Sequence, residues 1–368
     1  MTDTHSRIHY GMFLMPVHDA AKPLAQCYDE DLELVVRCEE LGFDEFWCGE
    51  HHSSTIENIV MPEIFLAKAL GMTKSIRLGP APVCLQYHNP ADVASRLAFL
   101  DHLSHGRLSV CFGVGAVPTD LEMHGVDPKQ SGAMMAEAID MILKLWTTEP
   151  PYEIKGQFWT VSLKNHVTPE LGIGAIHKPL QRPHPPIAVP CINRNSWSVK
   201  SAGARGFHLI SHHMASLGAL ADHWQTYAGA ARQAGRQPQL ADWKVSRNVF
   251  VADTTAEARQ IARQNSLGRC IDYILQLTRR FGDISMWKRD ASMSDAECNL
   301  DYFMKEVVIA GDPAEVTRQL LDLRERLGAF GTLVLVAHDW DDKKRWLRSL
   351  ELFAKEVMPV LNEQWLLR

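Results

Sequence analysis

The chain has 368 residues, of which 46% are hydrophobic and 22% charged, and its formal net charge is −6 at pH 7. This length can bury a large core, either as one barrel-sized domain or as two smaller domains. The acidic balance and the absence of a basic run argue against nucleic acid or an anionic membrane as a partner. No stretch reaches the roughly 18 to 20 apolar residues of a membrane span, and we expect a cytoplasmic protein.

The cysteines and paired histidines do not indicate a metal centre. Eight cysteines are scattered along the chain without a Cys-x-x-Cys pair, and we interpret them as reduced core thiols. His102 and His105 are three residues apart on a predicted helix, which is a spacing that metal ligands can use. Because no carboxylate or cysteine joins them at ligand spacing, we predict no metal site.

Short apolar runs alternate along the chain with stretches that carry apolar residues at helical spacing. Strands are predicted at 8–14, 45–48, 77–85, 107–112, 187–189, 208–211, 243–251 and 332–336. Helices are predicted between them and after the last one. These eight strand–helix units predict a closed parallel barrel of the (β/α)8 TIM type, formed by a single domain over residues 1–368.

Two blocks break the alternation, at 149–186 and 267–303. Both are longer than ordinary connections between secondary-structure elements, and we predict that they are irregular insertions. They account for the length beyond the roughly 250 residues of a typical barrel. We expect them to cover the functional face, with Trp159 and Trp287 as apolar candidates.

Three proton-handling residues, Glu50, His51 and His52, follow the predicted strand 45–48 after Gly49. The loops at the carboxyl ends of barrel strands collect functional side chains. Histidine also titrates near neutral pH, which suits it to proton transfer. We therefore expect chemistry at this tripeptide; the alternative is that its side chains only hold the loop by hydrogen bonds.

Several short motifs in order give the chain a family resemblance. They include Glu50-His51-His52, Tyr87-His88-Asn89-Pro90, Ser104-His105-Gly106-Arg107-Leu108, Ala310-Gly311-Asp312-Pro313 and Glu356-Val357-Met358-Pro359. In this pattern the chain resembles the bacterial luciferase-like flavin monooxygenases, especially the limonene and diketocamphane monooxygenase group. The resemblance implies a TIM barrel that holds FMN at the carboxyl ends of its strands.

The resemblance also implies roles for individual residues of the active site. His51 matches the family's active-site histidine, a base or proton manager near the reduced flavin, and Glu50 is its catalytic neighbour. Ala81 matches a position beside the flavin ring, where we predict a cis bond between Ala81 and Pro82. Proline makes this reasonable because it lowers the cost of a cis peptide bond.

The phosphate of the cofactor is expected at a second place. Asn195, Ser196 and Ser198 match the family's serine-rich turn at the start of a helix, where free amide donors and the helix dipole favour an anion. Plain capping of the helix is the alternative. Val114 is a further cofactor-binding candidate, although Gly113 and Val114 replace a cysteine and an arginine of some luciferases, so we claim neither a thiol nor an arginine clamp there.

The function implied by the resemblance is a two-component monooxygenase. It would use reduced FMN and O2 through a flavin C4a-peroxide and act on a hydrophobic substrate by Baeyer–Villiger oxidation, epoxidation or hydroxylation. A separate NAD(P)H-dependent flavin reductase would supply the FMNH2, which agrees with the absence of a Gly-x-Gly-x-x-Gly fingerprint from the sequence. His212 and His213 are open candidates for the pocket lining, and a homodimer is implied.

Two alternatives stay open: a deazaflavin-dependent oxidoreductase of the same superfamily, and a non-catalytic flavin-binding subunit. Cofactor binding would distinguish the first alternative. Retention of the tripeptide and the phosphate turn argues against the second.

Overall fold

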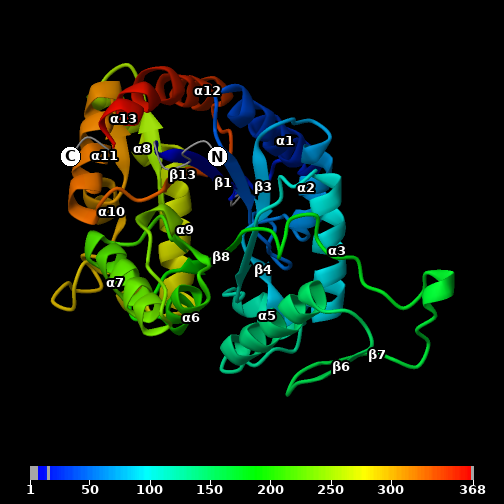
Figure 1. Ribbon diagram of the computed structural model, residues 1–368. Coiled ribbons are helices and arrows are strands. Elements are labelled where there is room, and N and C mark those ends of the chain that lie inside the picture. Colours follow the sequence, from blue (N-terminus) through cyan, green and yellow to red (C-terminus); the bar gives the residue numbers. More distant parts are fainter. Residues whose placement is uncertain (1–6, 15–16, 366–368) are drawn as a thin grey trace. The chain divides into compact units, whose positions relative to one another are not determined.

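The computed structural model describes residues 7–14 and 17–365 (Figure 1). They divide into two compact units: residues 7–14, 17–47, 55–58 and 189–365 form the first, and residues 48–54 and 59–188 form the second. The chain passes from one unit to the other within strands β2 (Glu45–Cys48) and β8 (Ile187–Cys191). The single domain that we predict therefore stays a prediction, and each unit is described by itself.

The strands of the first unit form a parallel series in the order β2-β1-β13-β10-β9-β8. Their bounds, besides those of β2 and β8, are β1 (His9–Leu14), β9 (His208–Ser211), β10 (Trp243–Arg247) and β13 (Thr332–Ala337). Strands β1 and β13 pair in register from His9↔Thr332 to Leu14↔Ala337. All residues of β13 are buried, as expected for a parallel strand that is covered on both faces.

The second unit contains β3 (Arg77–Pro80), β4 (Val83–Cys84) and β5 (Val110–Gly113). β4 pairs with β5, and β5 pairs with the beginning of β8. The strand predicted at 77–85 is divided by Ala81 and Pro82, and their peptide bond is cis, which confirms the prediction. The main sheet has nine described strands. When β3 and β4 are counted as halves of one strand, these correspond to the eight strands that the sequence predicts.

Helices alternate with these strands in both units. Their bounds are α1 (Leu24–Glu40), α2 (Pro62–Leu70), α3 (Pro90–Leu103), α4 (Pro118–Met123), α5 (Ser131–Thr147), α6 (Trp197–Arg205), α7 (Leu217–Gln233), α8 (Thr255–Gln264), α9 (Ser266–Phe281), α10 (Leu300–Glu306), α11 (Pro313–Leu327), α12 (Lys343–Leu352) and α13 (Met358–Gln364). Local signals explain several boundaries: Pro90 opens α3 and the Asn89 side chain accepts from the amide of Ala91, while Gly206 ends α6 with a φ of 73°. Among the described helices, none is long and apolar enough to cross a membrane.

The two predicted insertions differ in the structure. Block 149–186 holds the antiparallel hairpin of β6 (Tyr152–Lys155) and β7 (Thr160–Leu163) and otherwise short irregular segments, and it extends from the rest of the second unit (Figure 1). Block 267–303 begins instead with helix α9, so the prediction of irregular structure is wrong over its first half. The sequence does carry the signal of this helix, because the apolar residues of its buried face recur at helical spacing: Leu267, Cys270, Ile271, Ile274 and Leu275.

The strand predicted at 243–251 is also divided in the structure. β10 ends at Arg247, and after Asn248 the chain continues as β11 (Val249–Val251), which pairs with β12 (Ile309–Gly311) in a separate two-stranded sheet. The apolar run alone does not reveal this change of partner. Asn248 is thereby placed just beyond the carboxyl end of β10.

A buried histidine of the first unit lies between two carboxylates. His18 Nδ1 is 2.9 Å from Asp339 Oδ1, and Nε2 is 3.1 Å from Asp31 Oδ2. Lys22 Nζ donates to the same Asp339 oxygen at 2.5 Å. Burial alone would lower the pKa of His18, but the hydrogen bonds and charges of the two carboxylates outweigh it and raise the pKa to about 9.

We expect this cluster to lose stabilising energy as the pH rises. The pKa of His18 is raised from 6.5 in the unfolded chain to about 9 in the folded protein. The protonated imidazole therefore stabilises the folded state fully at pH values below 6.5, and this stabilisation is lost as the pH rises through about 9. The shift corresponds to roughly 3 kcal/mol. Urea unfolding of wild type and His18→Gln at about pH 6 and about pH 10 should show the stability difference shrinking by this amount; a constant difference would contradict the assignment.

Candidate active site

Glu50 is the centre of a buried hydrogen-bonded cluster in the second unit. Its Oε1 accepts from His52 Nε2 at 2.7 Å and from His88 Nε2 at 2.6 Å, and its Oε2 accepts from the amide of Cys84 at 2.9 Å. Burial would raise the pKa of Glu50, but these donors outweigh it and lower the pKa to about 2. Glu50 is therefore an ionised acceptor that orients two imidazoles, and its predicted catalytic role stays a prediction.

The same three side chains have the composition of a metal site. The ligand atoms of Glu50, His52 and His88 lie within 4.8 Å of one another. However, the contacts to Glu50 of 2.6 and 2.7 Å are hydrogen-bond distances, so internal hydrogen bonds already account for the cluster. His102 instead pairs its Nε2 with the carbonyl oxygen of Lys178, and the absence of a metal stays a prediction.

His51 has a different partner, Asp120 on helix α4. His51 Nδ1 lies 3.6 Å from Asp120 Oδ2, which is an ion-pair distance rather than a hydrogen bond. The backbone amides of Ser53 and His52 donate to Asp120 at 2.8 and 3.2 Å, and the Ser53 hydroxyl also donates to it. Burial would raise the pKa of Asp120, but His51, Ser53 and the His52 amide hold it well below its usual range.

This pair has the arrangement of a positioned base. The His51 side chain is 19% exposed, whereas Asp120 is 2% exposed, so the imidazole is accessible and its carboxylate partner is not. An ionised carboxylate beside an imidazole fixes the ring orientation and favours its protonated form. The sequence analysis missed Asp120, although Pro118 and an acidic residue in the following turn are signals of a helix start.

Aromatic rings surround His52 and limit the space next to the loop after β5. The His52 ring packs edge-on against Tyr87 and His124, with centroid distances of 5.7 and 4.7 Å. A Cβ atom at Gly115 would lie 2.0 Å from Tyr87 Oη, so a side chain at that position would clash. The preceding residue, Val114, is 41% exposed and is accessible to a ligand.

The second unit also holds the other predicted cofactor residue. Ala81 is 5% exposed and is joined to Pro82 by the cis bond. Its amide donates to the carbonyl oxygen of Cys48 at 2.6 Å, which ties the division between β3 and β4 to the end of β2.

The predicted phosphate turn lies in the first unit, at the start of α6. Asn195 has a left-handed backbone with a φ of 49°, and its amide donates to Asp222 Oδ1 at 2.6 Å. Ser196 is the N-cap residue of α6, yet among the described residues its side chain caps no amide of the helix. The hydroxyls of Ser196 and Ser198 lie 2.8 Å apart.

This geometry fits a phosphate better than plain capping. The first amides of a helix need acceptors. Within the described part of the chain, the Ser196 hydroxyl accepts from none of the amides of α6, so another group can serve as their acceptor. Two hydroxyls beside those amides add donors for a dianion. The amide of Asn195 is already committed to Asp222, so this residue would contribute its side chain rather than its backbone.

His212 and His213, the open candidates, follow β9 in the first unit. Their rings are stacked with centroids 4.2 Å apart, and Trp287 packs 4.9 Å from His212. Trp287 belongs to the second predicted insertion, in the 3-10 segment Ile284–Trp287. This part of the block therefore covers the residues beyond the carboxyl end of β9.

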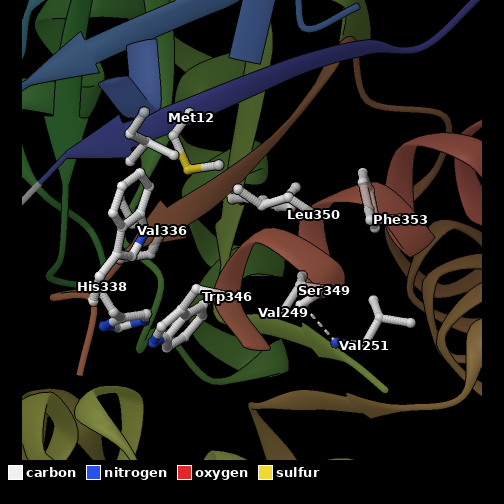
Figure 2. Close-up of a pocket in the computed structure, with 13 residues that line it drawn as sticks. Met12, Val249, Val251, Val336, His338, Trp346, Ser349, Leu350 and Phe353 are labelled. Carbon is white, nitrogen blue, oxygen red and sulfur yellow. Dashed lines mark hydrogen bonds between the residues drawn. The ribbon is translucent and has the colours of Figure 1, made fainter. Parts of the chain in front are cut away.

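An apolar pocket of the first unit lies apart from these predicted residues (Figure 2). Met12 of β1, Val336 of β13 and Leu350 of α12 line it, together with His338 and Ser349. The Ser349 hydroxyl accepts from the amide of Val251. We interpret this pocket as a packing gap between strands and their covering helices.

Comparison with known proteins identifies the family. The model of the family described as luciferase-like monooxygenase matches residues 8–329, and the chain belongs to this family. It is therefore an oxidoreductase of the monooxygenase class with the (β/α)8 barrel that the sequence predicts.

Individual relatives agree over nearly the full length. The chain is 31% identical to 3,6-diketocamphane 1,6-monooxygenase of Pseudomonas putida, covering 95% of this chain and 97% of that one. It is 32% identical to limonene 1,2-monooxygenase of Rhodococcus erythropolis, covering 98% and 89%.

Solved structures extend the comparison to the fold. One of them is the oxygenating constituent of 3,6-diketocamphane monooxygenase from the CAM plasmid of Pseudomonas putida, a type II Baeyer–Villiger monooxygenase in complex with FMN. It superposes with a TM-score of 0.87 at 31% identity, over 96% of this chain and 98% of that one. An F420-dependent secondary alcohol dehydrogenase superposes with a TM-score of 0.71 at 20% identity, over 96% and 99% of the two chains; this likeness shows the fold alone.

Proposed function

We propose that this protein is an FMNH2- and O2-dependent monooxygenase that adds one oxygen atom to a hydrophobic organic substrate. The overall reaction consumes FMNH2, O2 and substrate and yields FMN, water and the oxygenated product. The observation that carries the proposal is the accessible His51 beside the ionised, buried Asp120, in a chain that resembles FMN-binding oxygenating proteins over nearly its whole length.

The resemblance assigns two groups of residues to the cofactor. The side chains of Asn195, Ser196 and Ser198 would bind the phosphate with the first amides of α6. Ala81 and Val114 would contact the flavin ring. When bound, reduced FMN supplies the two electrons and activates O2.

His51 would manage the proton at the reacting atoms, and Asp120 would hold its ring in position. The imidazole can take a proton and return it within one turnover because histidine titrates near neutral pH. Glu50 would act indirectly. Its carboxylate fixes the ring of His52, and the backbone amide of His52 donates to Asp120. His51 is thus proposed as a catalytic residue, and Asp120 and Glu50 as positioning residues.

We also propose a separate flavin reductase as the source of FMNH2 and a homodimer as the assembly. The similarity to an oxygenating constituent supports the first of these. A reducing, cytoplasmic location is supported by the eight cysteines, all of which are buried.

The proposal is tested with labelled dioxygen. The purified full-length protein is mixed with chemically reduced FMN, 18O2 and a panel of terpene ketones and alkenes, and the products are analysed by mass spectrometry. One labelled oxygen atom per product molecule is expected. Protein-dependent consumption of FMNH2 without labelled product from any member of the panel would argue for a non-catalytic flavin-binding subunit.

The deazaflavin alternative is tested in parallel. Reduced deazaflavin replaces FMNH2 under anaerobic conditions with the corresponding ketones, and its oxidation is followed by absorbance. We expect no protein-dependent hydride transfer. Formation of an alcohol under these conditions would instead assign the chain to the deazaflavin group.

The phosphate turn gives a prediction that separates cofactor binding from helix capping. Ser196→Asp should cap α6 at least as well as serine and stabilise the helix through its dipole. The new carboxylate should nevertheless repel the phosphate and weaken FMN binding by roughly 10- to 100-fold, which corresponds to the loss of a hydrogen bond to a charged group. Fluorescence titration with FMN measures this effect.

Riboflavin, which lacks the phosphate, is the matched control ligand. Its affinity should change little in Ser196→Asp, because its ring contacts are intact. An equal loss of affinity for FMN and riboflavin would place the phosphate elsewhere.

A further inference from the structure

Polar side chains gather beyond the carboxyl ends of three neighbouring strands of the first unit. His213 lies two residues after β9, Asn248 directly after β10, and His338 directly after β13. These strands are adjacent in the order β9-β10-β13. Barrel enzymes bind ligands at this end of their strands, and the three residues are 1%, 0% and 7% exposed.

A chain of hydrogen bonds sets the tautomer of His213. His338 Nε2 donates to Asn248 Oδ1 at 3.0 Å, and Asn248 Nδ2 donates to His213 Nδ1 at 2.9 Å. Burial, followed by the charges of neighbouring groups, holds the pKa of His213 well below its usual range, so the ring is neutral. With Nδ1 as the acceptor, the single ring proton lies on Nε2.

That Nε2–H group is buried and, within the described part of the chain, has no hydrogen-bond acceptor. A buried donor without a partner costs roughly 1 to 3 kcal/mol. Buried polar groups are nearly always paired, so an exception of this kind calls for an explanation such as a ligand.

A buried cation, Arg247, is close enough to His213 for its charge to act on that ring. Arg247 is 3% exposed, and its Nη1 donates to the carbonyl oxygens of Ser246 at 3.1 Å and His213 at 3.5 Å. Burial lowers the pKa of Arg247 to about 10, although Tyr302 acts in the opposite direction, so the guanidinium is charged at neutral pH. Among the described residues, no carboxylate forms an ion pair with it. This edge of the strands therefore presents hydrogen-bond donors and positive charge to an incoming group.

We propose that His213 Nε2–H binds the carbonyl oxygen of the substrate, which makes this enzyme selective for ketones over alkenes. The assignment rests on the proposed monooxygenase function and names its substrate class. A ketone oxygen supplies the missing acceptor, whereas an alkene of the same shape leaves the donor unpaired. The donor and the nearby charge also polarise the carbonyl, which favours nucleophilic attack on its carbon in a Baeyer–Villiger oxidation.

Aromatic rings and a loop contact cover this part of the first unit. His212 stacks on His213, and Trp287 packs on His212. Arg194 Nη2 also donates to the carbonyl oxygen of Arg289, two residues after Trp287. Substrate entry then requires displacement of Trp287, and this indole reports on binding by its fluorescence.

The test compares camphor with 2-methylenebornane, in which a methylene group replaces the carbonyl oxygen. Dissociation constants are measured anaerobically by isothermal titration calorimetry and tryptophan fluorescence, so that no oxygenation is needed. Wild type should bind camphor roughly 10- to 100-fold more tightly, and His213→Phe should remove this preference by weakening camphor alone. Loss of the preference with an unchanged FMN affinity supports the assignment.

Other outcomes would overturn it. Equal binding of the two probes by wild type removes the carbonyl subsite, and a His213→Phe variant that loses FMN affinity but keeps the camphor preference assigns the donor to the flavin. If His213→Phe does not fold, 15N-histidine NMR of wild type decides: camphor must shift the protonated Nε2 resonance of His213. Failure of 18O incorporation with the camphor preference intact would overturn only the monooxygenase proposal.

Discussion

Replacing His51 by alanine is expected to lower substrate oxygenation by roughly 100- to 10,000-fold, the usual contribution of a positioned general acid–base group. His51 is the accessible member of the pair with Asp120, and no other described imidazole contacts this carboxylate in an ion pair. Affinity for FMN should stay nearly intact, because the proposed phosphate turn is made by other residues. Turnover is measured as labelled product formed per FMNH2 oxidised.

Two controls separate a chemical role of His51 from a structural role. Added imidazole should restore part of the activity of His51→Ala, and it should not affect the wild type. Asp120→Asn keeps the size of the side chain and one acceptor oxygen, which can still accept from the amide of Ser53, whereas its NH2 group replaces the oxygen that accepts from the amide of His52. It should retain activity between those of wild type and His51→Ala. Wild-type turnover in His51→Ala would remove His51 from the mechanism.

Local sequence signals account for the positions of the candidate site residues. Strand 45–48 places Glu50, His51 and His52 just beyond its end, and the structure has β2 with the same bounds. The cis bond at Ala81–Pro82 and the role of the turn before α6 were instead implied by the family resemblance, and local chemistry makes each plausible because proline lowers the cost of a cis bond and a helix start favours an anion. Such features depend on short-range backbone chemistry, which a single sequence carries.

The partners of these residues could not be predicted in the same way. Asp120 is 68 positions from His52, whose amide it binds, and Asn248 is 35 positions from His213 and 90 from His338. These pairings form only when strands that are distant in the sequence become neighbours. No residue periodicity encodes which acceptor a buried imidazole will meet, so the tautomer of His213 required the structure.

Breaking the buried ion pair of Lys244 and Glu45 by removing one partner is expected to destabilise the first unit strongly. Lys244 Nζ lies 2.7 Å from Glu45 Oε2, and both side chains are 9% exposed. Trp47 Nε1 donates to the other Glu45 oxygen at 2.8 Å, and Lys244 also donates to Thr332 Oγ1 at 3.3 Å. Glu45, Lys244 and Thr332 lie at or next to the amino ends of β2, β10 and β13, where barrel residues serve stability rather than catalysis.

Lys244→Met should destabilise the fold by roughly 3 to 5 kcal/mol, because it leaves the Glu45 carboxylate buried without a counter-ion. The double variant Glu45→Gln/Lys244→Met removes both charges, and Trp47 keeps an acceptor in the new amide. It should therefore recover most of the lost stability, since removing a buried pair as a whole is often nearly neutral. Urea unfolding of the wild type, both single variants and the double variant gives the coupling energy directly.

Assays of substrate oxygenation by the same variants show whether the ion pair affects activity as well as stability. Folded Lys244→Met protein, measured below its unfolding transition, should oxygenate substrate at a rate close to wild type, because the pair lies at the end of the strands opposite to His213 and Asn248. If the double variant were as unstable as Lys244→Met, the cost would come from lost packing rather than from an uncompensated charge. Additive effects of the two single substitutions would likewise show that the ions do not stabilise each other.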